Sequence, residues 1–130
     1  MILDTSALVA LLVNEAEAPA FARLIEDADV VRLSAGNYLE LGAVIDGRRN
    51  PALSRQVDAL LAEAQVVVEP VTAEQARIAR EAYRDFGRGS GHPASLNFGD
   101  CFAYALAKDK GETLLFKGDD FRRTDVRPAA

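Results

Sequence analysis

Short apolar runs that alternate with longer, helix-patterned stretches constrain the fold of this chain most strongly. The runs span residues 1–3, 30–33, 66–68 and 113–116. Between them, apolar side chains recur every three or four residues, which is the spacing of one helical face. Strands that alternate with helices in this way form a mainly parallel sheet covered by helices. The pattern therefore predicts an α/β sandwich around a mainly parallel sheet.

Local signals predict where the helices begin and end. After a short turn, a helix is expected over about 37–48, and a capping-box pattern begins another over about 72–86. The last helix is expected over about 97–108, after a glycine-containing loop at 88–95. No internal repeat or shift in composition divides the chain. We therefore expect a single domain over residues 1–130.

The net charge and the cysteine content limit the class of protein. The chain carries a net charge of −5, which argues against a simple nucleic-acid-binding module but not against an enzyme that acts on nucleic acid through cations. Its single cysteine, Cys101, cannot form an internal disulfide, which favours a reducing compartment. The apolar run at 7–13 is too short to span a bilayer. We expect a cytoplasmic protein that does not enter the membrane.

Acidic residues stand where the predicted strands end or the next helices begin. Asp4 ends the first strand, Glu40 and Asp100 lie in the first turns of two helices, and Asp119 and Asp120 follow the last strand. In a parallel sheet, the carboxyl ends of strands and the amino ends of the following helices share one edge, where ligands bind. We therefore expect these side chains to converge at that edge.

Each acid also has a purely structural interpretation. The segments 37–40 and 97–100 resemble helix-capping patterns, in which the acid satisfies backbone donors. Asp4 can cap the helix beside it, and the pair at 119–120 can be ordinary turn residues. Chance, however, gives no reason for an acid at every exit from the sheet edge. The joint pattern favours a functional site over independent caps and turns.

A cluster of carboxylates needs protons or a cation. Two carboxylates about 4 Å apart repel by about 1 kcal/mol in water and by about 4 kcal/mol at an effective dielectric constant near 20. Hard oxygen ligands without histidine or cysteine suit Mg²⁺ or Mn²⁺ rather than zinc. Such a cation promotes attack of water on a phosphodiester. Metal-assisted phosphodiester hydrolysis is the reaction class that fits this cluster.

Four segments give a more specific signal when they are taken in order along the chain. They are Met1-Ile2-Leu3-Asp4-Thr5-Ser6-Ala7, Tyr38-Leu39-Glu40, Leu96-Asn97-Phe98-Gly99-Asp100-Cys101 and Leu114-Leu115-Phe116-Lys117-Gly118-Asp119-Asp120-Phe121. Together they resemble the motifs of PIN-domain proteins and, more narrowly, of the VapC toxins of bacterial toxin–antitoxin pairs. The resemblance runs from the first residue to about Val126.

The resemblance implies a three-layer α/β/α fold, dependence on Mg²⁺ or Mn²⁺ and endonucleolytic cleavage of RNA. It also implies a homodimer and neutralisation by a cognate VapB-type antitoxin. Asp4 and Asp100 match the family's principal metal ligands, Glu40 matches its third acid, and Ser6 matches a small hydroxyl residue that supports the site. We expect Glu40 to orient or deprotonate the attacking water.

The fourth acid departs from the family pattern. Phe116-Lys117-Gly118 occupies the stretch where family members commonly carry Thr-x-Asp or Thr-x-Asn. We select Asp119 because it comes first after the strand, with Asp120 as the alternative.

Two other functions compete with a ribonuclease. An aspartate after the first strand also begins phospho-aspartate phosphotransfer sites, but Ser6 stands where such phosphatases need a second aspartate. The acid pattern does not fit a receiver either. A non-catalytic PIN scaffold is the second alternative, and the intact acids argue against it.

Basic residues indicate where RNA or a partner could bind. Four arginines at helical spacing, Arg77, Arg80, Arg84 and Arg88, are interleaved with acids, which favours a solvated helix face. The basic residues nearer the motifs are the preferred candidates for contacts with RNA or antitoxin, and they are Arg48, Arg49, Lys117, Arg122 and Arg123.

Overall fold

A four-stranded parallel sheet forms the centre of the computed structural model, which describes residues 1–130. The strands lie in the order β3-β2-β1-β4, and every neighbouring pair is parallel. Their bounds are β1 (Ile2–Leu3), β2 (Arg32–Ser34), β3 (Val67–Glu69) and β4 (Leu114–Leu115). The predicted parallel sheet is confirmed, although each strand is only two or three residues long.

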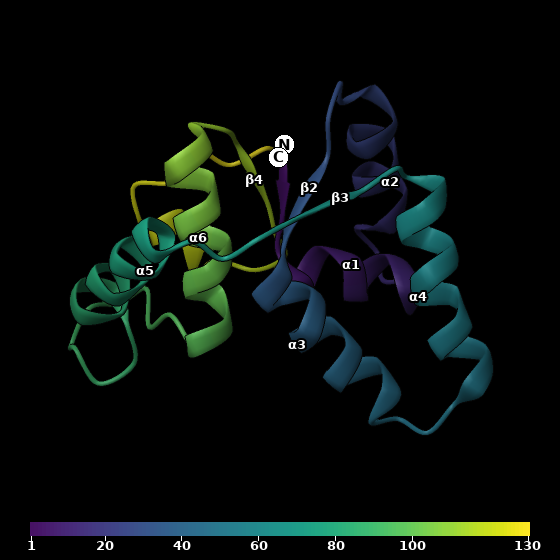
Figure 1. Cartoon of the computed structure of the whole chain (residues 1–130), viewed down its shortest axis with the longest axis horizontal. Coiled ribbons are helices and arrows are strands. Elements are labelled where there is room, and N and C mark those ends of the chain that lie inside the picture. Colours follow the sequence, from purple (N-terminus) through teal and green to yellow (C-terminus); the bar gives the residue numbers. More distant parts are fainter.

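Helices cover both faces of the sheet (Figure 1). One face carries α1 (Thr5–Leu12), α2 (Ala18–Asp27), α3 (Ala35–Asp46) and α4 (Pro51–Glu63), and the other carries α5 (Ala73–Phe86) and α6 (Phe98–Lys110). A short 3₁₀ turn, η1 (Phe121–Arg123), follows β4. The three layers α/β/α are therefore present as predicted. No helix is long and apolar enough to cross a membrane.

Alternation along the strands divides the core into two halves. Ile2 and Leu114 point toward α5 and α6, whereas Leu3 and Leu115 point toward α1–α4, and all four side chains are fully buried. Successive residues of a strand face opposite sides of a sheet, so two apolar neighbours fill both cores. Strands buried on both faces read as continuous apolar runs, which explains the runs at 1–3 and 113–116.

The third helix begins earlier than the sequence predicted. Ser34 is its N-cap, and its hydroxyl accepts a hydrogen bond from the Gly36 N–H at 3.2 Å. The expected turn at 34–36 is therefore wrong, because a serine at the end of β2 caps the helix directly. As a consequence Asn37 lies inside the helix, fully buried, and Glu40 lies in the second turn rather than the first.

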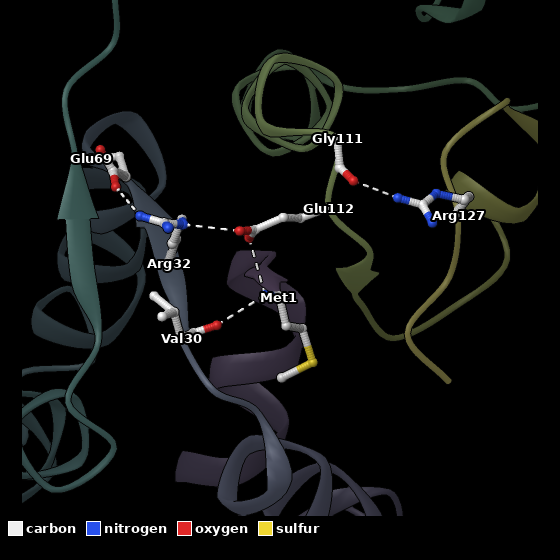
Figure 2. Close-up of polar contacts among 7 residues, drawn as sticks. All are labelled: Met1, Val30, Arg32, Glu69, Gly111, Glu112 and Arg127. Atoms are coloured by element: carbon white, nitrogen blue, oxygen red, sulfur yellow. Dashed lines mark hydrogen bonds and ion pairs between the residues drawn. The ribbon is translucent and has the colours of Figure 1, made fainter.

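The edge at which the strands begin is joined by ion pairs (Figure 2). The terminal amino group of Met1 donates to the Val30 carbonyl at 2.9 Å and to Glu112 at 3.0 Å. Arg32 then bridges Glu112 at 3.1 Å and Glu69 at 2.6 Å. These contacts tie the starts of β1, β2 and β4 together and leave the opposite edge as the place where the acids gather.

Candidate active site

Asp4 is buried at the carboxyl end of β1 and caps helix α1. Its Oδ2 accepts hydrogen bonds from the Ser6 N–H at 3.0 Å and from the Ser6 hydroxyl at 2.6 Å. The Ser6 hydroxyl in turn accepts from the Lys117 N–H, just after β4, at 3.0 Å. Only 4% of Asp4 is exposed, and its Oδ1 has no hydrogen-bond partner. Ser6 thus fixes one oxygen of Asp4 and leaves the other free.

Glu40 is held from two elements. The Thr5 hydroxyl donates to its Oε1 at 2.5 Å, and the buried side-chain amide of Asn37 donates to the same oxygen at 3.3 Å. The Asn37 amide also donates to the Gly99 carbonyl at 2.9 Å, which joins α3 to the start of α6. A Cβ atom at Gly99 would collide with the Glu40 carboxylate, so glycine allows the carboxylate to lie where it does.

Asp100 is both a capping residue and a candidate site acid. The Asn97 side chain accepts from the Asp100 N–H at 2.8 Å, and the Asp100 carboxylate accepts from the Asn97 N–H at 2.9 Å. This reciprocal pair is the capping box expected from the sequence. The box uses Oδ2 of Asp100, so the cap fixes the side chain at the start of α6. Structural and functional roles are therefore compatible in one residue.

The electrostatics show that the acids share one environment. Burial raises the pKa of Asp4 to about 7, the charges of Asp100 and Glu40 add to that rise, and the Ser6 hydrogen bonds oppose it. Burial also raises the pKa of Asp100 to about 6, opposed by the Asn97 backbone hydrogen bond, with the charges of Asp120 and Glu40 raising it further. The fold therefore collects negative charge that Arg88 offsets only in part.

Asp120, rather than Asp119, is the member of the last pair whose charge acts on Asp100. Both side chains are exposed, in the turn that leads from β4 into η1. Gly118, at a φ of +98°, reverses the chain before them in a conformation that favours glycine. The sequence preferred Asp119 because it comes first after the strand, whereas the turn brings the charge of Asp120 closer to the site.

The residues fit a hard divalent cation. The side chains that share the site are all carboxylates, which are the ligands that Mg²⁺ and Mn²⁺ prefer. The unpartnered, buried Oδ1 of Asp4 is a polar atom that a cation would satisfy. No three acidic, histidine or cysteine side chains lie close enough to form a complete ligand set in this structure. The fit therefore rests on donor chemistry and on the unbalanced charge.

Known proteins share this chain's sequence over nearly its full length. It matches the PIN-domain family over residues 1–127. It is 60% identical to Ribonuclease VapC28 of Mycobacterium tuberculosis over 129 residues, which is 99% of this chain and 97% of that protein. The chain belongs to the VapC family of PIN-domain ribonuclease toxins. Ribonuclease VapC42 of the same organism is 54% identical over 99% of this chain and 98% of that protein.

Solved structures of VapC proteins have the same fold. A crystal structure of M. tuberculosis VapC20, described as a toxin that cleaves the sarcin–ricin loop, gives a TM-score of 0.71 at 25% identity and covers 98% of both chains. VapBC2 from Rickettsia felis, bound to a fragment of its promoter DNA, gives 0.74 at 14% identity and covers 98% of this chain and 94% of that chain. The predicted family and fold are confirmed, and the phosphotransfer alternative loses its support.

Most basic residues that the sequence placed near the VapC site are engaged elsewhere. Lys117 pairs with Glu15 and lies 3.7 Å from Glu17. Arg122 stacks over the Phe116 ring at 5.5 Å and donates to a carbonyl near the end of the chain. The sequence assigned Arg88 to a solvated helix face, whereas its positive charge lowers the pKa of Asp100. Only the fold reveals its location, because helix α5 ends at Phe86 and the chain then turns toward α6.

Proposed function

We propose that residues 1–130 form one PIN domain that hydrolyses RNA phosphodiester bonds as the toxin of a toxin–antitoxin pair, with Mg²⁺ or Mn²⁺ as its cofactor. The supporting observation is the sheet edge at which the charges of Asp4, Glu40 and Asp100 act on one another while Oδ1 of Asp4 has no partner. Family membership supplies the class of reaction, and the site supplies the residues that would perform it.

The proposed roles follow from how each side chain is held. Asp4 and Asp100 would hold the cation, together with Asp120, which we now prefer to Asp119. When bound, the divalent ion supplies the positive charge that activates water and stabilises charge on the phosphodiester. Ser6 keeps Asp4 in place through Oδ2, which leaves Oδ1 free to hold the cation.

Glu40 is proposed to take the proton from the attacking water. Both hydrogen bonds that hold Glu40 use Oε1, donated by Thr5 and Asn37, so Oε2 can accept a proton. A general base must be fixed within hydrogen-bond reach of the proton that it abstracts. The Thr5 and Asn37 donors fix the carboxylate of Glu40 against Gly99, so the position of the proposed base is set.

The test combines cleavage with metal binding. The purified chain, freed from its antitoxin, should cleave single-stranded RNA with added Mg²⁺ or Mn²⁺ and lose that activity in excess EDTA. Titration with Mn²⁺, followed by electron paramagnetic resonance, should show binding at millimolar concentration or below. Equal cleavage in EDTA would refute the metal mechanism. Absence of both cleavage and metal binding would instead favour the non-catalytic scaffold.

The proposed partners are a second copy of the chain and a cognate VapB-type antitoxin, in the cytoplasm. Support for the homodimer comes from large apolar side chains that remain exposed beside the site. Leu39 on α3 is 73% exposed, and Phe98 at the start of α6 is 75% exposed. Water-exposed apolar side chains on neighbouring elements are typical of an interaction surface. Analytical ultracentrifugation should find a dimer for the wild type and a monomer for Leu39→Asp.

A further inference from the structure

The chain after helix α5 holds Arg88 beside the start of α6. The Arg88 N–H donates to the Leu96 carbonyl at 2.9 Å, and the Leu96 N–H donates to the Phe86 carbonyl at 2.9 Å. Gly87 and Leu96 therefore form a parallel bridge outside the main sheet. Leu96 directly precedes Asn97, the N-cap of the helix that carries Asp100. Arg88 is thus fixed to the same segment as a site acid.

Contacts inside the loop 88–95 reinforce this position. The Ser90 hydroxyl accepts from the His92 N–H at 3.1 Å, and His92 Nδ1 accepts from the Ala94 N–H at 3.0 Å. The His92 ring packs edge-on against Phe86, with 4.9 Å between ring centroids. Backbone hydrogen bonds therefore close this loop at its base, and side-chain contacts hold its interior. The sequence marked the loop only by its glycine content. The fold, rather than a chance loop conformation, determines where Arg88 lies.

Arg88 has no acidic partner, unlike Arg77 and Arg84 on α5. Arg77 pairs with Glu74 at 2.9 Å, and Arg84 donates twice to Asp85, at 2.8 and 3.1 Å. The Arg88 side chain is exposed and makes no hydrogen bond or ion pair. Its backbone is held by Leu96, four residues before Asp100 in the chain. An unpaired guanidinium on the segment that leads into α6 is therefore available for an anion that approaches the site.

We propose that the guanidinium of Arg88 binds a backbone phosphate of the RNA strand next to the bond that is cleaved. This inference rests on the proposed ribonuclease function and adds a residue that holds the substrate. An acidic site repels the RNA backbone, and a single arginine at its border offsets that repulsion where the strand enters. The guanidinium fork binds phosphate oxygens through two parallel hydrogen bonds, which fixes orientation as well as position.

Arg80 provides a matched control. It is exposed, makes no ion pair, and lies within helix α5, eight residues before Arg88 in the chain. If any arginine on this side of the molecule attracted RNA by charge alone, Arg80→Gln and Arg88→Gln would have equal effects. A specific phosphate contact makes them unequal.

The experiment measures binding of a short fluorescein-labelled single-stranded RNA by anisotropy, in an Asp4→Asn background that does not cleave it. Arg88→Gln should weaken binding about tenfold, the range of one charge-assisted hydrogen bond. Arg80→Gln should change it less than twofold. The slope of log affinity against log salt should fall by about 0.7 for Arg88→Gln, the value for one phosphate on a single strand. Arg88→Lys should retain the slope and recover part of the affinity.

Several outcomes would overturn the proposal. Equal losses for the Arg80 and Arg88 variants would show non-specific attraction, and an unchanged salt slope would exclude a phosphate contact. If Arg88→Gln weakened binding of the antitoxin but not of RNA, this residue would belong to a protein interface instead. Thermal unfolding of each variant checks that the fold is retained. If the wild type binds RNA but does not cleave it with metal, the proposed function fails while the Arg88 result still stands.

Discussion

The two edges of the sheet differ in whether their charged groups are paired. At the edge where the strands begin, the Met1 amino group and Arg32 are matched by Glu69 and Glu112, and each charge has a hydrogen-bonded partner (Figure 2). At the edge where the strands end, burial and neighbouring acids raise the pKa values of both Asp4 and Asp100. The first edge is complete as folded, whereas the second carries charge that the proposed cation would balance.

This difference separates stability from function within one small fold. A balanced network contributes to the free energy of unfolding, and an unbalanced buried carboxylate lowers it, because burial disfavours the ionised form. The proposed function would explain why the unbalanced edge persists, since the rest of the fold can compensate for a destabilising site. Substitutions at the two edges should therefore have opposite consequences, and the following predictions test that contrast.

Asp4→Asn should have the largest effect. It removes a proposed metal ligand, and a metal ion contributes several kcal/mol to stabilising charge in the transition state, so RNA cleavage should fall by at least about a hundredfold. The variant should unfold at the same temperature as the wild type or higher, because a neutral amide replaces a buried acid. A cleavage assay and calorimetry test both parts. Full activity, or a large loss of stability, would contradict the contrast between the edges.

The unfolding free energy should depend on pH in a direction set by the same acids. The folded-state pKa of Asp4 is about 7 and that of Asp100 about 6, both above the ordinary 3.8. Between about pH 4 and pH 7 the unfolded chain has released these protons while the folded chain retains them, so without divalent metal the stability should fall as the pH rises. Mg²⁺ should restore stability mainly near pH 7. Denaturant titrations with EDTA and with Mg²⁺ measure both trends, and a stability that rose over this range in EDTA would refute the assignment.

Topology made part of the site predictable from sequence. Asp4 and Asp100 stand at a strand end and a helix start, and parallel strands bring such positions to one edge. The local signals for these two residues were also correct, since Asp4 caps α1 and Asp100 completes a capping box. Their surroundings could not be read locally. The Asn37 amide joins Gly99, which lies 62 residues away in the chain, and no spacing rule marks such a contact.

Two further differences between the predictions from sequence and the structure have local causes. Ser34 and Asn37 are both good N-cap residues, and the sequence pattern favoured the wrong one because Glu40 completed an apparent capping box. The arginine spacing suggested one continuous helical face, but α5 ends at Phe86, so Arg88 leaves that face. Helix α5 ends where the sequence predicted, so the arginine spacing misled only because Arg88 lies beyond that end.

Asp119→Asn and Asp120→Asn should distinguish the two candidates for the fourth acid. Asp120 acts on the charge of Asp100, so Asp120→Asn should reduce cleavage about tenfold, in the range seen when a group around a metal site is lost. Asp119→Asn should change cleavage less than threefold, and each variant serves as the control for the other. The pair should be compared at limiting Mg²⁺, where a weakened cation site shows most clearly. A larger loss for Asp119→Asn would restore the residue that the sequence favoured.

Glu112→Gln should have the smallest effect, and its sign tests the other edge. The substitution removes the charge that links Met1 to Arg32. Because the side chains of Glu112 and Arg32 are each about one quarter exposed, the unfolding free energy should fall by only about 1 kcal/mol. Cleavage at saturating Mg²⁺ should not change, because no proposed site residue contacts this network. Glu74→Gln, which breaks a much more exposed pair with Arg77, should cost less than about 0.5 kcal/mol. If Glu112→Gln reduced cleavage while leaving stability intact, the two edges would be coupled and their separate roles would have to be abandoned.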